Sequence, residues 1–136
     1  MGYDLCPRNK QTKGWYANLS FMDNIRQAME KARIDKGITA KLCFCDGEYV
    51  KKAEALEIAE KLSAFLEKNP VILLGTGKTL KKYEAEMKKF SESNELLGWN
   101  GKKHEGITIL RKGDDLWKSM QGFADFCRKS GGFWVW

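Results

Sequence analysis

The 136-residue chain contains a single histidine, two prolines and no long apolar run, and these shortages exclude several classes of protein. The sole histidine, His104, lies in a polar turn, which favours a solvated side chain over a positioned proton carrier, and no cysteine has a local context that would activate it as a nucleophile. No segment approaches the roughly 18 apolar residues that span a bilayer. Charges at Asp4, Arg8 and Lys10 occupy the positions where a secretory signal needs an apolar run. We therefore expect no membrane segment and a cytoplasmic location, and we favour a non-enzymatic protein over an enzyme with an unrecognised site.

The four cysteines, at positions 6, 43, 45 and 127, are irregularly spaced. With one histidine in the chain they make a poor set of metal ligands, and their apolar surroundings favour buried, reduced thiols. Cys43 and Cys45 should share one face of a strand. The sequence therefore predicts no metal and no cofactor.

The segment 71–79 looks like an apolar strand followed by a phosphate-binding loop, because Gly77, Lys78 and Thr79 end it. That loop needs a glycine five residues before its Gly-Lys-Thr, where the backbone curls around the phosphate, and Ile72 occupies this position. We therefore expect no nucleotide hydrolysis. Lys78 remains a candidate anion contact because free backbone N–H groups gather at a helix start.

Composition predicts one folded domain over residues 1–136, since 43% of the residues are hydrophobic and 31% are charged. Lys and Arg number 24 against 18 Asp and Glu, which gives a net charge of +6. This excess favours anionic partners, namely a small anionic ligand, nucleic acid or the acidic face of a host protein.

Apolar periodicity predicts an α+β fold in which about four helices pack on a small mixed or antiparallel sheet. The helices are expected over 20–37, 53–68, 79–90 and 114–130, and the strands over 15–19, 41–45, 71–74, 107–110 and 133–136. In the last strand Phe133 and Val135 should face one side, and Trp134 and Trp136 the other. We expect this segment to be docked, either as a strand in the protein's own sheet or against a second copy, and as an edge strand it would favour a homodimer.

Two polar segments, residues 8–16 and 99–104, combine cations with aromatic rings, and Lys78 is a third candidate anion contact. A cation offers charge to a phosphate and a ring offers a stacking plane to a base. The alternative is an ordinary surface loop that follows a core aromatic. The candidate ligand-binding residues are Arg8, Lys10, Lys13, Trp15, Tyr16, Lys78, Trp99, Asn100, Lys102, Lys103 and His104.

The opening Met1-Gly-Tyr-Asp-Leu with Pro7-Arg-Asn, and the closing Phe123-Ala-Asp-Phe through Ser130-Gly-Gly-Phe to Trp136, resemble a family of small uncharacterised proteins of phages and prophages. The resemblance covers about a third of the chain and carries no catalytic residues. It implies a phage-encoded accessory protein in a bacterial cytoplasm, where countering host defence is a common role. The leading hypothesis is a non-enzymatic binder of a small phosphorylated, nucleotide-type ligand. The alternatives are a protein that binds nucleic acid or inhibits a host protein through its basic surface, and an enzyme with an unrecognised site.

Overall fold

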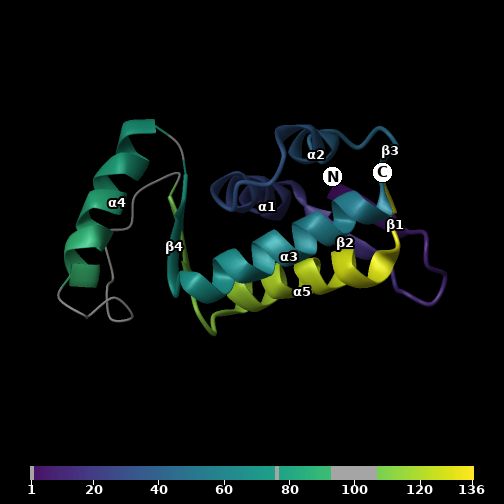
Figure 1. Ribbon diagram of the computed structural model, residues 1–136. Helices are drawn as coiled ribbons and strands as arrows, with labels where there is room; N and C mark the ends of the chain where they lie inside the picture. The colour runs from purple at the N-terminus through teal and green to yellow at the C-terminus, as the bar shows by residue number, and fades with distance from the viewer. Residues whose placement is uncertain (1, 76, 93–106) are drawn as a thin grey trace.

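The computed structural model describes residues 2–75, 77–92 and 107–136 (Figure 1). These residues form five helices and six strands in two antiparallel sheets, which confirms the predicted α+β fold. In chain order the elements are β1 (Gly2–Pro7), β2 (Trp15–Asn18), α1 (Leu19–Lys31), α2 (Lys36–Lys41), β3 (Glu48–Val50), α3 (Lys52–Lys68), β4 (Val71–Leu74), α4 (Gly77–Glu92), β5 (Thr108–Arg111), α5 (Asp115–Ser130) and β6 (Phe133–Val135).

The larger sheet has the strand order β2-β1-β6-β3, and every neighbouring pair is antiparallel. Phe133 and Val135 are fully buried while Trp134 and Trp136 are exposed, so the predicted alternation along the last strand is confirmed. The edge-strand prediction is wrong, because β6 pairs with β1 on one side and β3 on the other. The expected homodimer therefore loses the unpaired strand edge on which that prediction rested.

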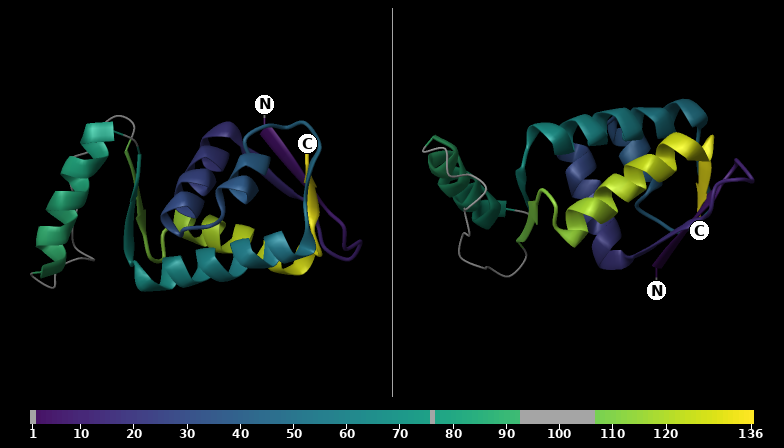
Figure 2. Two further views of the ribbon diagram at one scale, coloured as in Figure 1. Left: turned by 45° about the horizontal axis from the view of Figure 1, so that its top comes forward. Right: turned by 90° about the horizontal axis from the view of Figure 1, so that it is seen from below.

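The main core lies between the inner face of this sheet and helices α1, α2, α3 and α5. Helices α3 and α5 run side by side along the molecule, as Figures 1 and 2 both show. The predicted apolar stripe of α3 is buried, since Ala55, Ile58, Ala59, Leu62 and Leu66 all contribute to the core. The stripe therefore positions α3 by burying its apolar face.

The first predicted helix is wrong in extent, and the second predicted strand is not a strand. The helix expected over 20–37 ends at Lys31, and Gly37 lies inside a second, short helix instead of ending the first. The segment 41–45 is the end of α2 followed by a turn, because Asp35 accepts a hydrogen bond from Gly37 N and caps a new helix. Phe44 is consequently 70% exposed and does not alternate into a sheet.

The second sheet is a ribbon of two strands, β4 and β5, with the register Ile72 opposite Leu110 and Leu73 opposite Ile109. One face of the ribbon, with Ile72, Leu74 and Leu110, belongs to the main core. The other face packs against Tyr83 of α4 in a separate small cluster. All four residues of β4 are therefore buried. We call β4, α4 and β5 the arm, and the remaining described elements the body; Figure 2 shows α4 at one end of the molecule, beyond the ribbon.

Candidate anion-binding site

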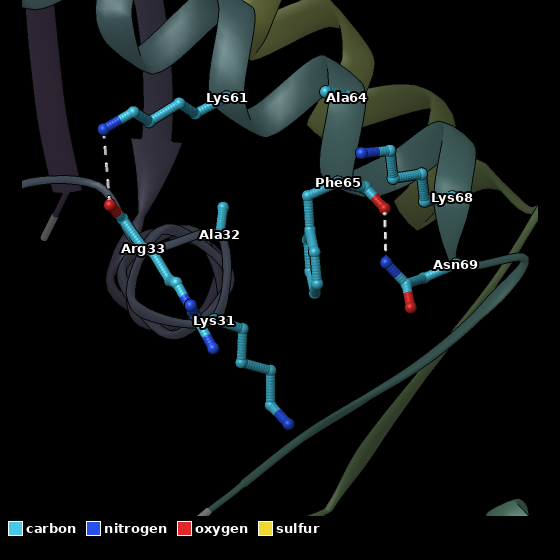
Figure 3. Close-up of a pocket in the computed structure, with 8 residues that line it drawn as sticks. All are labelled: Lys31, Ala32, Arg33, Lys61, Ala64, Phe65, Lys68 and Asn69. Atoms are coloured by element: carbon cyan, nitrogen blue, oxygen red, sulfur yellow. Dashed lines mark hydrogen bonds between the residues drawn. The ribbon is translucent and has the colours of Figure 1, made fainter.

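A hollow of about 290 Å³ lies between the end of α1 and the C-terminal half of α3, and we call it the basic pocket (Figure 3). Its lining combines four cations with one aromatic ring and one amide. The lining residues are Lys31, Ala32, Arg33, Lys61, Ala64, Phe65, Lys68 and Asn69. Figure 3 shows the ring of Phe65 reaching into the space between the two helices.

Helix periodicity explains how α3 supplies its side of the basic pocket. Lys61, Phe65 and Lys68 are spaced at i, i+4 and i+7, so they share one face of the helix. Asn69 follows the last turn, and its amide nitrogen donates to the backbone oxygen of Phe65 at 2.8 Å. This bond holds the amide at the end of the helix beside the ring.

Arg33 enters the pocket from an unusual backbone conformation. Its φ of 61° is the only positive value among the non-glycine residues that the structure describes. Arg33 N donates to Glu30 O at 3.0 Å and Ile34 N donates to Met29 O at 3.1 Å, which is the Schellman arrangement that ends a helix. Glycine usually occupies this left-handed position, because a side chain there costs about 1–2 kcal/mol.

The charges around the pocket leave a positive excess. Lys31 Nζ pairs with Glu84 Oε1 of α4 at 2.6 Å, and Lys61 Nζ lies 3.5 Å from Glu57 Oε2. Within the described part of the chain, Arg33 and Lys68 have no carboxylate partner. Two cations are therefore available to an anion, and neither has to give up an existing ion pair.

Helix ends account for part of this charge. Lys31 and Lys68 lie in the last turns of α1 and α3, where the negative end of the helix dipole favours a cation. Arg33 lies beyond the end of α1, so the dipole gives it less stabilisation. Its presence at a position that prefers glycine is the feature that helix stability does not explain.

A second hollow of about 310 Å³ adjoins the basic pocket and leads towards the arm. Lys31, Phe65 and Asn69 line both spaces, and Val71, Ile72, Leu73, Glu84 and Met87 complete the second one. The cation-lined basic pocket is thus continuous with a mostly apolar cleft. This arrangement suits a ligand that has an anionic end and a flat or apolar body.

The structure places the sequence-predicted residues elsewhere. Arg8, Lys10 and Lys13 are exposed on the loop between β1 and β2, and Tyr16 is exposed on the outer face of the larger sheet. Trp15 turns inward against Phe123 and Phe126, so it does not present a free stacking plane. None of these residues lines the basic pocket.

The other predicted residues add no described side chain to a site. The backbone of Lys78 lies in the first turn of α4, and Trp99, Asn100, Lys102, Lys103 and His104 lie outside the described residues. The basic pocket itself was missed by sequence reasoning. A detectable signal was present in the two lysines of α3 that flank Phe65 on one helix face.

The cysteine prediction is wrong for two of the four thiols. Cys6 and Cys45 are exposed, Cys43 is partly buried and only Cys127 is buried. Burial raises the pKa of the Cys127 thiol well above its ordinary value. Across the residues that the structure describes, no group of three or more histidine, cysteine or acidic side chains is arranged to hold a metal ion.

No helix in the described ranges is long and apolar enough to cross a membrane. Comparison of the chain with protein-family models, with curated proteins and with solved structures found no match. The resemblance to phage proteins therefore stays a prediction. The functional argument rests on the geometry of the chain itself.

Proposed function

We propose that this chain is a non-enzymatic binding protein that holds a small phosphorylated, nucleotide-type ligand in the basic pocket. As an accessory protein of a phage, it would sequester this ligand in the host cytoplasm, away from a defence pathway. Arg33 carries the proposal, because a cation that occupies a backbone position favoured by glycine, beside three lysines, implies a selected role for its side chain.

The residues that line the basic pocket suggest which of them bind the phosphates and which binds the base. The guanidinium of Arg33 and the ammonium of Lys68 bind phosphate oxygens through charge-assisted hydrogen bonds. The ring of Phe65 provides the surface on which a base stacks. The eight lining residues include no carboxylate, histidine or cysteine, so the pocket holds an anion and offers little for proton transfer.

Replacing Arg33 by glycine separates binding from stability. Arg33→Gly removes the cation and also relieves the left-handed strain, so the free energy of unfolding should stay the same or rise by up to about 1 kcal/mol. Affinity for ATP, measured by isothermal titration calorimetry at low salt, should fall by about tenfold or more. Inorganic tripolyphosphate should bind more weakly than ATP, because it cannot stack on Phe65.

Matched variants keep this test decisive. Lys68→Ala should weaken ATP binding as Arg33→Gly does, whereas Lys118→Ala, which removes an exposed cation of α5 outside the pocket, should leave it unchanged. ATP should be recovered intact after incubation with magnesium. The proposal fails if the unchanged protein binds neither ATP nor tripolyphosphate, or if all three variants bind them equally well.

A further inference from the structure

The outer face of the four-stranded sheet carries exposed aromatic rings where a solvated sheet normally carries polar side chains. Tyr16 of β2 is 61% exposed, and Trp134 and Trp136, in and just after β6, are 36% and 55% exposed. The register places Tyr16 opposite Asp4, and Asp4 exchanges backbone hydrogen bonds of 2.9 and 2.8 Å with Trp136. Tyr16, Asp4 and Trp136 therefore form one row across three neighbouring strands.

These rings are held in place by glycines and by one another. A side chain at Gly2 would collide with the ring of Tyr16, and one at Gly47 would collide with the ring of Trp136. Trp134 packs against Tyr49 of β3 with ring centroids 4.8 Å apart. The rings rest against the backbone and are organised before any ligand arrives, which lowers the entropy lost on binding.

Between Tyr16 and Trp136 the face contains a hollow of about 420 Å³, whose lining also includes Asp4, Cys6 and Gly14. Asp4 is exposed, so its carboxylate can accept a hydrogen bond from an amino group or a ring N–H group of a base. A site with flanking rings and one acceptor suits an unpaired base.

The charged residues around the outer face are distributed unevenly, with cations gathered at one end of the sheet. The loop between β1 and β2 is fixed to the end of α5, because Arg8 N donates to Gly132 O at 2.8 Å and Thr12 Oγ1 donates to Lys129 O at 3.0 Å. Asn9 adds two further bonds to this end, from its backbone nitrogen to Ser130 O at 2.8 Å and from its amide to Lys129 O at 3.2 Å. The exposed Arg8, Lys10, Lys13 and Lys129 are thereby held at the Pro7 end of the sheet.

The exposed carboxylate of Asp46 lies at the diagonally opposite corner, next to Gly47, which abuts the ring of Trp136. Glu48 lies on the same edge strand, β3, but opposite the buried Val135, so it belongs to the inner side of the sheet. Phosphates are consequently attracted to the loop corner and repelled from the β3 corner. This polarity, next to the exposed rings, matches a chain of bases joined by phosphates better than an apolar protein surface.

We infer that this face is a second binding site, distinct from the basic pocket, which stacks the unpaired bases of a single-stranded nucleic acid on Tyr16 and Trp136. Its phosphates lie against Arg8, Lys10 and Lys13. The inference does not depend on the function proposed for the basic pocket.

Fluorescence anisotropy of a labelled oligothymidylate of about 12 nucleotides provides the test. The full chain should bind at low salt, and Tyr16→Ala with Trp136→Ala should weaken binding by about tenfold or more. Trp136→Phe should restore part of the affinity because it keeps a stacking plane. Phe44→Ala removes an exposed aromatic outside the hollow and should have no effect.

Charge reversal and the basic-pocket variant complete the test. Lys10→Glu with Lys13→Glu should reduce the magnitude of the slope of log affinity against log salt by about 1.4 or more, since each phosphate contact to a single strand contributes about 0.7. Arg33→Gly should leave oligonucleotide binding unchanged. Absence of binding by the full chain would overturn the inference, as would binding that survives loss of both rings or depends on Arg33. It would also be overturned if Tyr16→Ala with Trp136→Ala converted a dimer to a monomer in sedimentation, because the face would then be covered by a second copy.

Discussion

The body and the arm bury apolar surface in different ways. The body encloses one continuous core between a four-stranded sheet and four helices, with Leu5, Met22, Leu62 and Phe133 almost fully buried. The arm has a small cluster in which Val71, Leu73 and Tyr83 are buried and the surrounding residues only partly so. A two-stranded ribbon is marginal by itself, so the arm depends on the face that β4 and β5 present to the body. The second hollow, which continues the basic pocket, lies where the arm meets the body.

Among the changes considered, removal of residues 133–136 should lower the stability of the body the most. The deletion takes out an inner strand of the body together with the buried Phe133 and Val135, and leaves β1 and β3 without their shared neighbour. We expect a loss of about 5 kcal/mol or more in the free energy of unfolding, which approaches the whole stability of a typical domain.

Thermal unfolding followed by circular dichroism measures this loss. The shortened chain should show no cooperative transition near that of the full chain. A transition at the same temperature would mean that β6 is dispensable and that the described sheet order is wrong.

Single truncations should distinguish the two regions. Phe123→Ala empties a fully buried site in the body and should cost about 3–5 kcal/mol, with faster amide hydrogen exchange throughout the chain. Tyr83→Ala should raise exchange in β4, β5 and α4 while α3 and α5 keep their protection. Equal loss of protection everywhere in both variants would show that body and arm unfold as one unit.

A smaller effect is expected from an ion pair inside the body. Lys41 Nζ lies 2.7 Å from Glu54 Oε1, and Lys51 N donates to the same oxygen at 3.0 Å. Partial burial opposes ionisation of Glu54, but these hydrogen bonds outweigh it and hold the pKa of Glu54 below its ordinary 4.5. A lowered folded-state pKa stabilises the protein above the unfolded-state value, and this contribution is lost as the pH falls through the folded-state pKa.

Denaturant unfolding between pH 7 and pH 3 tests this expectation. Glu54→Gln should be less stable than the unchanged chain near pH 7, and the difference should shrink as the pH falls below about 4.5. Glu60→Gln, at an exposed position of α3, serves as the control. A difference that does not vary with pH would contradict the assigned role of Glu54.

Elements with long apolar periodicity were predictable from the sequence, and short elements were not. The stripe of α3 and the apolar run of β4 identify these elements by themselves, and the left-handed Gly131 at the end of α5 lies where the Gly-Gly pair predicts a stop. β3 was missed because it pairs with β6, a partner that is remote in sequence, and the pairing of β1 with β6 across its other edge was equally invisible in the local pattern.

The candidate sites show the same limit. Cations and rings that are adjacent in sequence, as at Arg8 to Tyr16, are easy to recognise but do not line the basic pocket. That pocket joins Arg33 to Lys68 across two helices, and only the packing of α1 near α3 brings them together. The alternation in β6 did predict that Trp134 and Trp136 share a face, although nothing local indicated that Tyr16 lies in the same row.

The pairing of β1 with β6 also governs how the protein acquires its shape. Gly2–Pro7 must meet Phe133–Val135 across almost the whole sequence, whereas β1 and β2 close through a short loop. Closing the long loop costs more chain entropy, and folds rich in such distant contacts form slowly. The hairpin of β1 and β2 should therefore appear early in refolding, and the complete row of Tyr16, Asp4 and Trp136 late. During refolding, the aromatic face would be among the last surfaces to become able to bind a nucleic acid.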